Sequence, residues 1–139
     1  MIVVDTSALI AILEGEQDAD LYAHAIAEAD PPLISAATLV EAGVVLIHRQ
    51  GEMAARLLDE IIRDGSFKIE SVTAYQAQLA REAYAVYGKG QHTAGLNFGD
   101  CFSYALAKAT GLPLLFKGND FGQTDIEKAK TEGTCIDLP

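Results

Sequence analysis

The chain has few basic residues, two cysteines and no long apolar run. It has 10 Lys and Arg residues against 20 Asp and Glu residues, and its formal net charge at pH 7 is −10. This balance excludes a protein that coats nucleic acid or an anionic membrane through a basic surface, because such binding needs an excess of positive charge. The excess acids form either a solvated surface or, in part, a site.

The cysteines and the apolar segments exclude further classes. Cys101 and Cys135 are far apart and form no CxxC pair, so we expect buried free thiols in a reducing cytoplasm rather than a zinc site. The longest apolar stretch, residues 33–47, contains polar interruptions and is shorter than the roughly 20 residues of a membrane-spanning helix. The apolar run from Met1 ends at Asp5, unlike a signal peptide. We therefore expect a cytoplasmic protein without a membrane partner.

The length of 139 residues and the absence of low-complexity segments predict one domain over residues 1–139. Short apolar strands alternate with helical patterns, which predicts an α/β fold of three layers with a central, mostly parallel sheet flanked by helices. The expected strands are residues 2–4, 33–34, 67–69 and 112–116, with an edge strand around Ile136. The expected helices are residues 8–13, capped by Thr6 or Ser7, then 18–29, 36–50, 53–63, 73–87 with Thr73 as its cap, 100–110, and a short one opened by Asp125.

Acidic residues occupy positions that a parallel sheet would bring to one edge. Asp5 and Asp120 each follow a predicted strand, and Asp100 opens the helix that leads into the second of these strands. Glu41 is the only charge in the most apolar helix. Ligands of open parallel sheets collect at the carboxyl ends of the strands. Local structure offers a second explanation for each acid: a helix cap for Asp5 and Asp100, a turn for Asp120, and a solvent-facing stripe for Glu41.

Convergence of these acids would create a cation site. Carboxylates in close proximity cannot all stay ionised without a compensating positive charge. Carboxylate oxygens and water are the ligands that Mg²⁺ and Mn²⁺ prefer. Such a site activates water and clamps a phosphodiester, and the chain offers no obvious covalent nucleophile, because Cys101 lies on an apolar helix. The pattern therefore favours metal-dependent hydrolysis.

Several sequence blocks resemble those of a known family. Val4-Asp5-Thr6-Ser7-Ala8, the segment 37–42 around Glu41, and the segment 96–101 around Asp100 resemble the three signature blocks of PIN-domain ribonucleases. The closing segment, residues 114–121 followed by Thr124-Asp125, is similar to that of VapC-type toxins of prokaryotic toxin–antitoxin pairs. The resemblance covers nearly the whole chain, in order.

The resemblance implies an Mg²⁺- or Mn²⁺-dependent endoribonuclease that hydrolyses RNA phosphodiester bonds with a metal-activated water. Asp5 and Asp100 would be the metal ligands. Glu41 would complete the site and orient the attacking water, and Asp120 would be the fourth acid. The resemblance also implies a small cognate antitoxin as partner and a homodimer formed through helices.

Supporting residues follow from the same blocks. Thr6 or Ser7 would supply a hydroxyl near the metal or the phosphate, and Lys117 is a candidate for contact with the RNA backbone. Asn119 is a neutral neighbour that could replace Asp120 in the metal site, and Asp125 is an outer alternative.

Two other interpretations stay open at this point. A receiver-type phosphoacceptor α/β domain would need an Asp at the end of a middle strand, whereas residues 67–69 are followed by Glu70-Ser71. A non-catalytic PIN-like scaffold that only binds a protein would be expected to lose members of the acid set, and this chain keeps all four of them.

Overall fold

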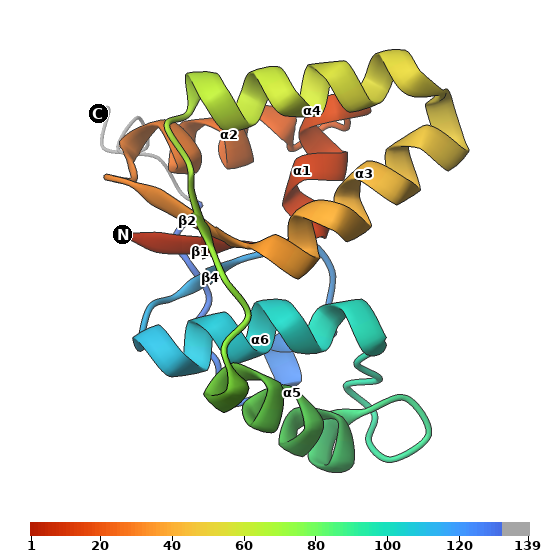
Figure 1. The fold of residues 1–139 in the computed structure, drawn as a ribbon, viewed down its shortest axis with the longest axis vertical. Coiled ribbons are helices and arrows are strands. Elements are labelled where there is room, and N and C mark those ends of the chain that lie inside the picture. Colours follow the sequence, from red (N-terminus) through yellow and green to blue (C-terminus); the bar gives the residue numbers. More distant parts are fainter. Residues whose placement is uncertain (132–139) are drawn as a thin grey trace, which may run out of the picture.

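In the computed structural model, which describes residues 1–131, the strands form one four-stranded parallel sheet of order β3-β2-β1-β4. The strands are β1 (Ile2–Val4), β2 (Pro32–Ser35), β3 (Lys68–Glu70) and β4 (Leu114–Leu115). Helices cover both faces of this sheet in Figure 1, so the predicted three-layer α/β fold is confirmed.

The helices divide between the two faces of the sheet in the order of the chain. One face carries α1 (Thr6–Leu13), α2 (Ala19–Glu28), α3 (Ala36–Gln50) and α4 (Glu52–Asp64), drawn above the sheet in Figure 1. The other carries α5 (Ala74–Tyr87) and α6 (Phe98–Thr110), and a 3₁₀ helix, η1 (Phe121–Gln123), follows β4.

A separate apolar core lies on each face of the sheet. Val3 packs into the core under α5 and α6, whereas its neighbour Val4 packs into the core under the first four helices. Leu114 and Leu115 of β4 divide in the same way. Successive side chains of a strand point to opposite faces, so strands with both faces covered are apolar throughout, as the sequence of β1 predicts.

The topology gathers several helix starts at one edge of the sheet. α1 begins directly after β1, and α3 begins directly after β2, with Ser35 as its N-cap. Because the strands are parallel, both helices start at the same edge. In Figure 1 this edge lies to the right, where α6 also begins. The fold therefore brings residues from distant segments to the carboxyl ends of β1 and β2.

Helix starts account for two differences from the sequence-based expectation. Asp5, rather than Thr6 or Ser7, caps α1, because its side chain accepts a hydrogen bond from the backbone of Ser7. α6 begins at Phe98 instead of Asp100, since Asn97 is its N-cap and forms a capping box with Asp100.

The closing segment also differs from the expectation. Only Leu114–Leu115 of the expected strand 112–116 pair as β4. No helix starts at Asp125, because the one helical turn in this segment, η1, precedes it and buries Phe121 in the core. The expected edge strand around Ile136 lies outside the described residues.

Two expectations about excluded classes can be compared with the fold. Within residues 1–131, no helix has the length and apolar character needed to cross a membrane. Cys101 is a buried free thiol, and burial raises its pKa to about 11. Cys135 lies outside the described residues.

Candidate active site

Asp5 occupies the end of β1 and is almost fully buried, with 2% of its surface exposed. Its Oδ2 accepts hydrogen bonds from the backbone N–H of Ser7 at 3.0 Å and from the Ser7 hydroxyl at 2.7 Å. Its Oδ1 accepts a hydrogen bond from the hydroxyl of Ser103 at 2.5 Å. The helix cap and the candidate ligand are thus the same carboxylate, not alternatives. These hydrogen bonds fix the orientation of the Asp5 carboxylate, but all of its partners are neutral, so its negative charge is not compensated.

Glu41 projects from α3 toward the starts of α1 and α6. The hydroxyl of Thr6 donates to Glu41 Oε1 at 2.7 Å. The carboxylate also lies directly against Gly99, where any Cβ would collide with it. Burial raises the pKa of Glu41, the Thr6 hydrogen bond opposes that rise, and the negative charge of Asp5 adds to it. Glu41 is therefore half-buried in the fold and close to Asp5, not part of a solvent-facing stripe.

Asp100 lies in the first turn of α6, where its carboxylate accepts the backbone N–H of Asn97 at 2.9 Å. Burial raises the pKa of Asp100 to about 7, against the lowering effect of the Asn97 hydrogen bond. The negative charges of Asp5, Asp120 and Glu41 raise this pKa further. All four predicted acids therefore share one electrostatic neighbourhood, which we call the acid cluster. Its members are Asp5, Glu41, Asp100 and Asp120.

The segment after β4 contributes Asp120 and two of the predicted supporting residues. Asp120 and Asn119 are both exposed, and Asp120 makes no capping hydrogen bond to η1. The backbone N–H of Lys117 donates to the Ser7 hydroxyl at 2.9 Å, which ties this segment to the end of β1. The side chain of Lys117 forms ion pairs with Glu16 and with Asp18, so its ammonium group faces the loop after α1.

Asp125 is outside the acid cluster. Its Oδ1 accepts a hydrogen bond from the Tyr104 hydroxyl at 2.6 Å, and its Oδ2 accepts one from Lys108 Nζ at 2.6 Å. Burial alone would raise the pKa of Asp125, but the hydrogen bonds from Lys108 and Tyr104 outweigh it and lower the pKa. The charge of Asp125 is already compensated by a lysine of this chain.

The acid cluster offers the carboxylate oxygens that a hard divalent cation prefers as ligands. Its hydrogen-bond partners in residues 1–131 are hydroxyls and backbone N–H groups, and the ion pairs there involve other acids. No group of three or more His, Cys, Asp or Glu side chains in these residues is placed to hold an ion by itself. Carboxylate oxygens are nevertheless the ligand type that Mg²⁺ prefers, and Mg²⁺ needs only one or two of them because it keeps several water ligands.

Sequence reasoning missed three residues that support the acids, of which two are buried hydroxyls. Ser103, on α6, contacts Asp5, and Thr38, on α3, contacts Ser103 at 3.1 Å. Gly99 provides the space that the Glu41 carboxylate fills. Ser103 lies one helical turn after Asp100 and hence on the same face of α6, which was the available signal for it.

Comparison with known proteins places the chain among a group of related ribonucleases. The family model of the PIN domain matches residues 2–127. Ribonuclease VapC28 of Mycobacterium tuberculosis is 54% identical over 128 residues, which cover 91% of this chain and 96% of that protein. Ribonuclease VapC of Mycolicibacterium smegmatis is 51% identical over 124 residues, which cover 89% of this chain and 96% of that protein.

Solved structures support the same relationship. The crystal structure of Mycobacterium tuberculosis VapC20, a sarcin-ricin loop cleaving toxin, matches with a TM-score of 0.73 at 25% identity, covering 91% of this chain and 96% of that one. A toxin–antitoxin complex from Klebsiella pneumoniae matches with a TM-score of 0.65 at 20% identity, covering 90% and 93% of the two chains, and so shares the fold.

Proposed function

The chain belongs to the PIN-domain family, as a ribonuclease of the VapC type, and we propose that its RNA-cleaving centre is the acid cluster loaded with Mg²⁺ or Mn²⁺. One observation carries the assignment of the centre. Asp5 is the N-cap of α1, Glu41 lies in the second turn of α3 and Asp100 in the first turn of α6. The charge of Asp5 acts on Glu41, the charges of Asp5 and Glu41 act on Asp100, and no basic side chain of residues 1–131 is bonded to these three acids. Such a charge arrangement is stable only with a cation or with bound protons.

The side chains would divide the work at this centre. A bound divalent cation would supply positive charge to a phosphodiester and to water at the site. Asp5 and Asp100 are the proposed ligands, since the first is held rigidly and the second is half-buried with a raised pKa. Thr6 holds Glu41 by its Oε1, which leaves Oε2 to orient a water molecule. Asp120 would complete the cluster from the exposed segment after β4.

The hydroxyls and amides around the acids suit supporting roles. Ser7 and Thr6 already bond to Asp5 and Glu41, so we assign them to holding the acids rather than to RNA. Asn119 is exposed beside Asp120 and is a candidate contact for the RNA backbone. Lys117 would reach a phosphate only by leaving Glu16 and Asp18, with a rearrangement of the loop after α1.

The proposed partners are a small cognate antitoxin and a second copy of this chain. An antitoxin would inhibit the enzyme by placing a basic side chain against the acid cluster, whose charges lack a protein counter-ion in residues 1–131. For the homodimer, α3 offers an apolar stripe at i, i+4 and i+7: Val40, Val44 and Ile47 are 65%, 61% and 49% exposed.

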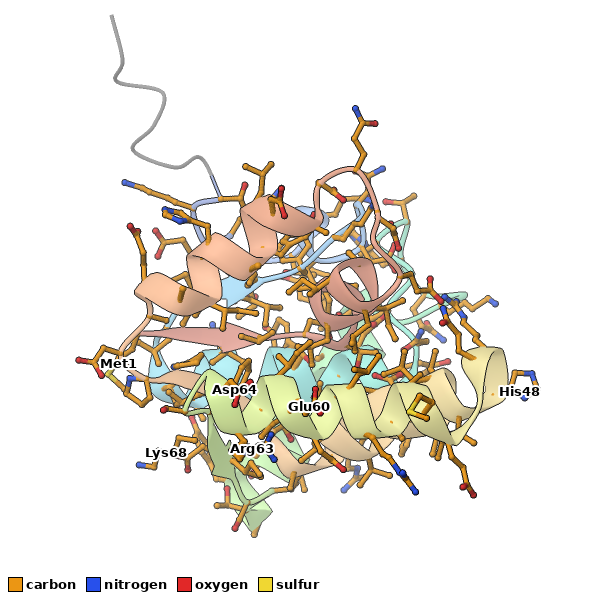
Figure 2. All side chains as sticks on the ribbon, turned by 90° about the horizontal axis from the view of Figure 1, so that it is seen from above. Met1, His48, Glu60, Arg63, Asp64 and Lys68 are labelled. Carbon is orange, nitrogen blue, oxygen red and sulfur yellow. The ribbon has the colours of Figure 1, made fainter. Side chains whose placement is uncertain are left out.

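A groove between α2 and α4, of about 820 Å³, offers a further surface for the antitoxin. Ile26 and Ile61 line it, together with Leu57, which is 44% exposed. Figure 2 shows α2 and α4 on this side of the molecule and labels Glu60 and Asp64, which also line the groove. Apolar residues with acids beside them suit an amphipathic helix that carries basic residues. We place this pair in the cytoplasm, where RNA substrates occur.

Cleavage of total bacterial RNA by the purified protein, with mapping of the new ends, tests the proposed function. We expect internal cuts at discrete sites in MnCl₂ or MgCl₂ and no cuts after addition of EDTA. A protein that cuts equally well in EDTA would contradict the cation site. A folded protein that cuts no RNA in either buffer would instead favour the non-catalytic scaffold.

A further inference from the structure

A chain of buried hydroxyls runs from α3 through α6 to the carboxylate of Asp5. Ser103 and Thr38 are both fully buried, with no exposed surface. Ser103 Oγ lies 2.5 Å from Asp5 Oδ1, and Thr38 Oγ1 lies 3.1 Å from Ser103 Oγ. Buried hydroxyls are retained at a cost unless they have hydrogen-bond partners, and within residues 1–131 no buried polar side-chain atom lacks one.

The direction of these hydrogen bonds follows from the chemistry of the acceptor. An ionised carboxylate only accepts hydrogen bonds, so Ser103 donates its proton to Asp5. The Ser103 oxygen is then an acceptor in its second bond, and Thr38 donates to it. The order of donation is therefore Thr38 to Ser103 to Asp5, and each hydroxyl has a single orientation.

The other oxygen of Asp5 is held in a matching way. Ser7 donates to Oδ2 through both its backbone N–H and its hydroxyl. The Ser7 hydroxyl in turn accepts the backbone N–H of Lys117 at 2.9 Å. A carboxylate oxygen offers about two lone-pair sites. Both sites of Oδ2 are therefore used, whereas Oδ1 accepts one hydrogen bond and keeps one site for a further ligand.

We propose that Ser103 and Thr38 are positioning residues that orient Asp5 so that its Oδ1 is the atom that binds the divalent cation. The inference rests on the proposed function, because it assumes that Asp5 is a cation ligand. Residues that hydrogen-bond to metal ligands fix the orientation of those ligands, and their loss lowers metal affinity about 10- to 100-fold. Ser103 and Thr38 are fully buried and would touch neither RNA nor the ion, so their effect passes through Asp5.

Isothermal titration calorimetry tests this role: the purified protein is titrated with MnCl₂ in the absence of RNA, and the dissociation constant of Mn²⁺ is measured for each variant. We expect Ser103→Ala to weaken Mn²⁺ binding about tenfold, because it deletes the hydroxyl that holds Oδ1. Thr38→Val should weaken it less, since Ser103 keeps its own bond to Asp5. Thr38→Ser should restore wild-type affinity, because it keeps the hydroxyl.

Thr110→Ala is the matched control. Thr110 is also a hydroxyl residue of α6, but it bonds to the backbone oxygen of Leu106 at the far end of the helix. The Thr110→Ala variant should therefore bind Mn²⁺ as tightly as the wild type does. Thermal melts in EDTA check that each variant is folded, and Thr38→Val carries the test if Ser103→Ala does not fold.

The outcomes separate this inference from the proposed function. If wild type binds Mn²⁺, Asp5→Asn does not, and folded Ser103→Ala binds as wild type does, the positioning role is overturned and the cation site stands. If folded Thr38→Val binds Mn²⁺ as tightly as the wild type and Thr38→Ser do, the positioning role of Thr38 is overturned. Absence of Mn²⁺ binding by the wild type would overturn both the inference and the proposed centre.

Discussion

The pKa values of two aspartates near α6 are shifted in opposite directions by the clusters in which they lie. Asp125 bonds to Lys108 and Tyr104, and its pKa is lowered because those hydrogen bonds outweigh burial. Asp100 lies near the other end of the helix, where burial and the charges of neighbouring acids raise its pKa to about 7. The first cluster supplies its own cation, and the second leaves its negative charge without one in residues 1–131. This difference, rather than the number of acids, marks the second as a candidate cation site.

Substitution of a proposed ligand should have the largest effect and should separate the two clusters. Asp5→Asn and Asp100→Asn should each lower kcat/KM for RNA at least about 100-fold, a loss of about 2.7 kcal/mol in transition-state stabilisation. Asp125→Asn should stay within about threefold of wild type, because it disturbs only a half-exposed ion pair. Initial rates on a mapped RNA substrate measure all three.

Circular dichroism spectra of the three variants would check that each is folded. Cleavage at wild-type rates by Asp5→Asn and Asp100→Asn would contradict the assignment of the acid cluster as the active centre. A 100-fold loss in Asp125→Asn alone would instead move the active centre to the other cluster.

Substitution of Gly99 should have the next largest effect, since a Cβ there would collide with the Glu41 carboxylate. Gly99→Ala should lower kcat about tenfold by displacing Glu41, a smaller loss than removal of a ligand. Gly43→Ala is the control, because it lies on the same helix as Glu41 and its Cβ would meet nothing within 4 Å. It should keep wild-type activity and stabilise α3 by up to about 1 kcal/mol. Equal activity of the two variants would show that the position of Glu41 does not matter.

The pH dependence of stability should have opposite signs in the two clusters. The folded pKa of Asp100 is above its ordinary value, so the folded protein binds a proton more tightly than the unfolded chain. Stability from this group is therefore present below pH 4 and lost as pH rises toward 7. In EDTA, the melting temperature of Asp100→Asn minus that of wild type should rise from pH 4 to pH 7.

Asp125 should show the reverse trend. Its folded pKa is lowered, so its contribution is present above its ordinary pKa of 3.8 and is lost as pH falls through the folded value. Asp125→Asn should thus be less stable than wild type at pH 7, and the difference in melting temperature should close below pH 4.

The contradicting outcome for Asp100 is a pair of parallel curves. If the melting temperatures of wild type and Asp100→Asn change in parallel between pH 4 and pH 7, Asp100 has no raised pKa.

The sequence predicts the sheet and most helices well because their apolar periodicity is local. β1 and α3 have the expected bounds, and Thr73 caps α5 as expected. The sequence pattern misplaces the start of α6, because Gly99-Asp100 resembles a helix start, whereas in the structure Asn97 is the N-cap and forms a capping box with Asp100. A residue pattern alone does not reveal which of two nearby polar residues satisfies the free N–H groups.

The topology predicts that the four acids gather at one end of the sheet, and the charges of Asp5, Asp120 and Glu41 do act on Asp100. The contacts that support the acids depend on tertiary structure. The approach of Glu41 to Gly99 and the bond from Ser103 to Asp5 join segments 58 and 98 positions apart, which no local pattern encodes. The separate fate of Asp125 has the same origin, since Tyr104 and Lys108 lie on one face of α6, four residues apart.

Anomalous diffraction from a crystal grown in MnCl₂ would test the central claim most directly. We predict a manganese peak within coordination distance of Asp5 Oδ1 and of the Asp100 carboxylate, with the remaining ligands supplied by water. A manganese peak elsewhere, or none at the acid cluster under conditions in which the protein cleaves RNA, would contradict the account.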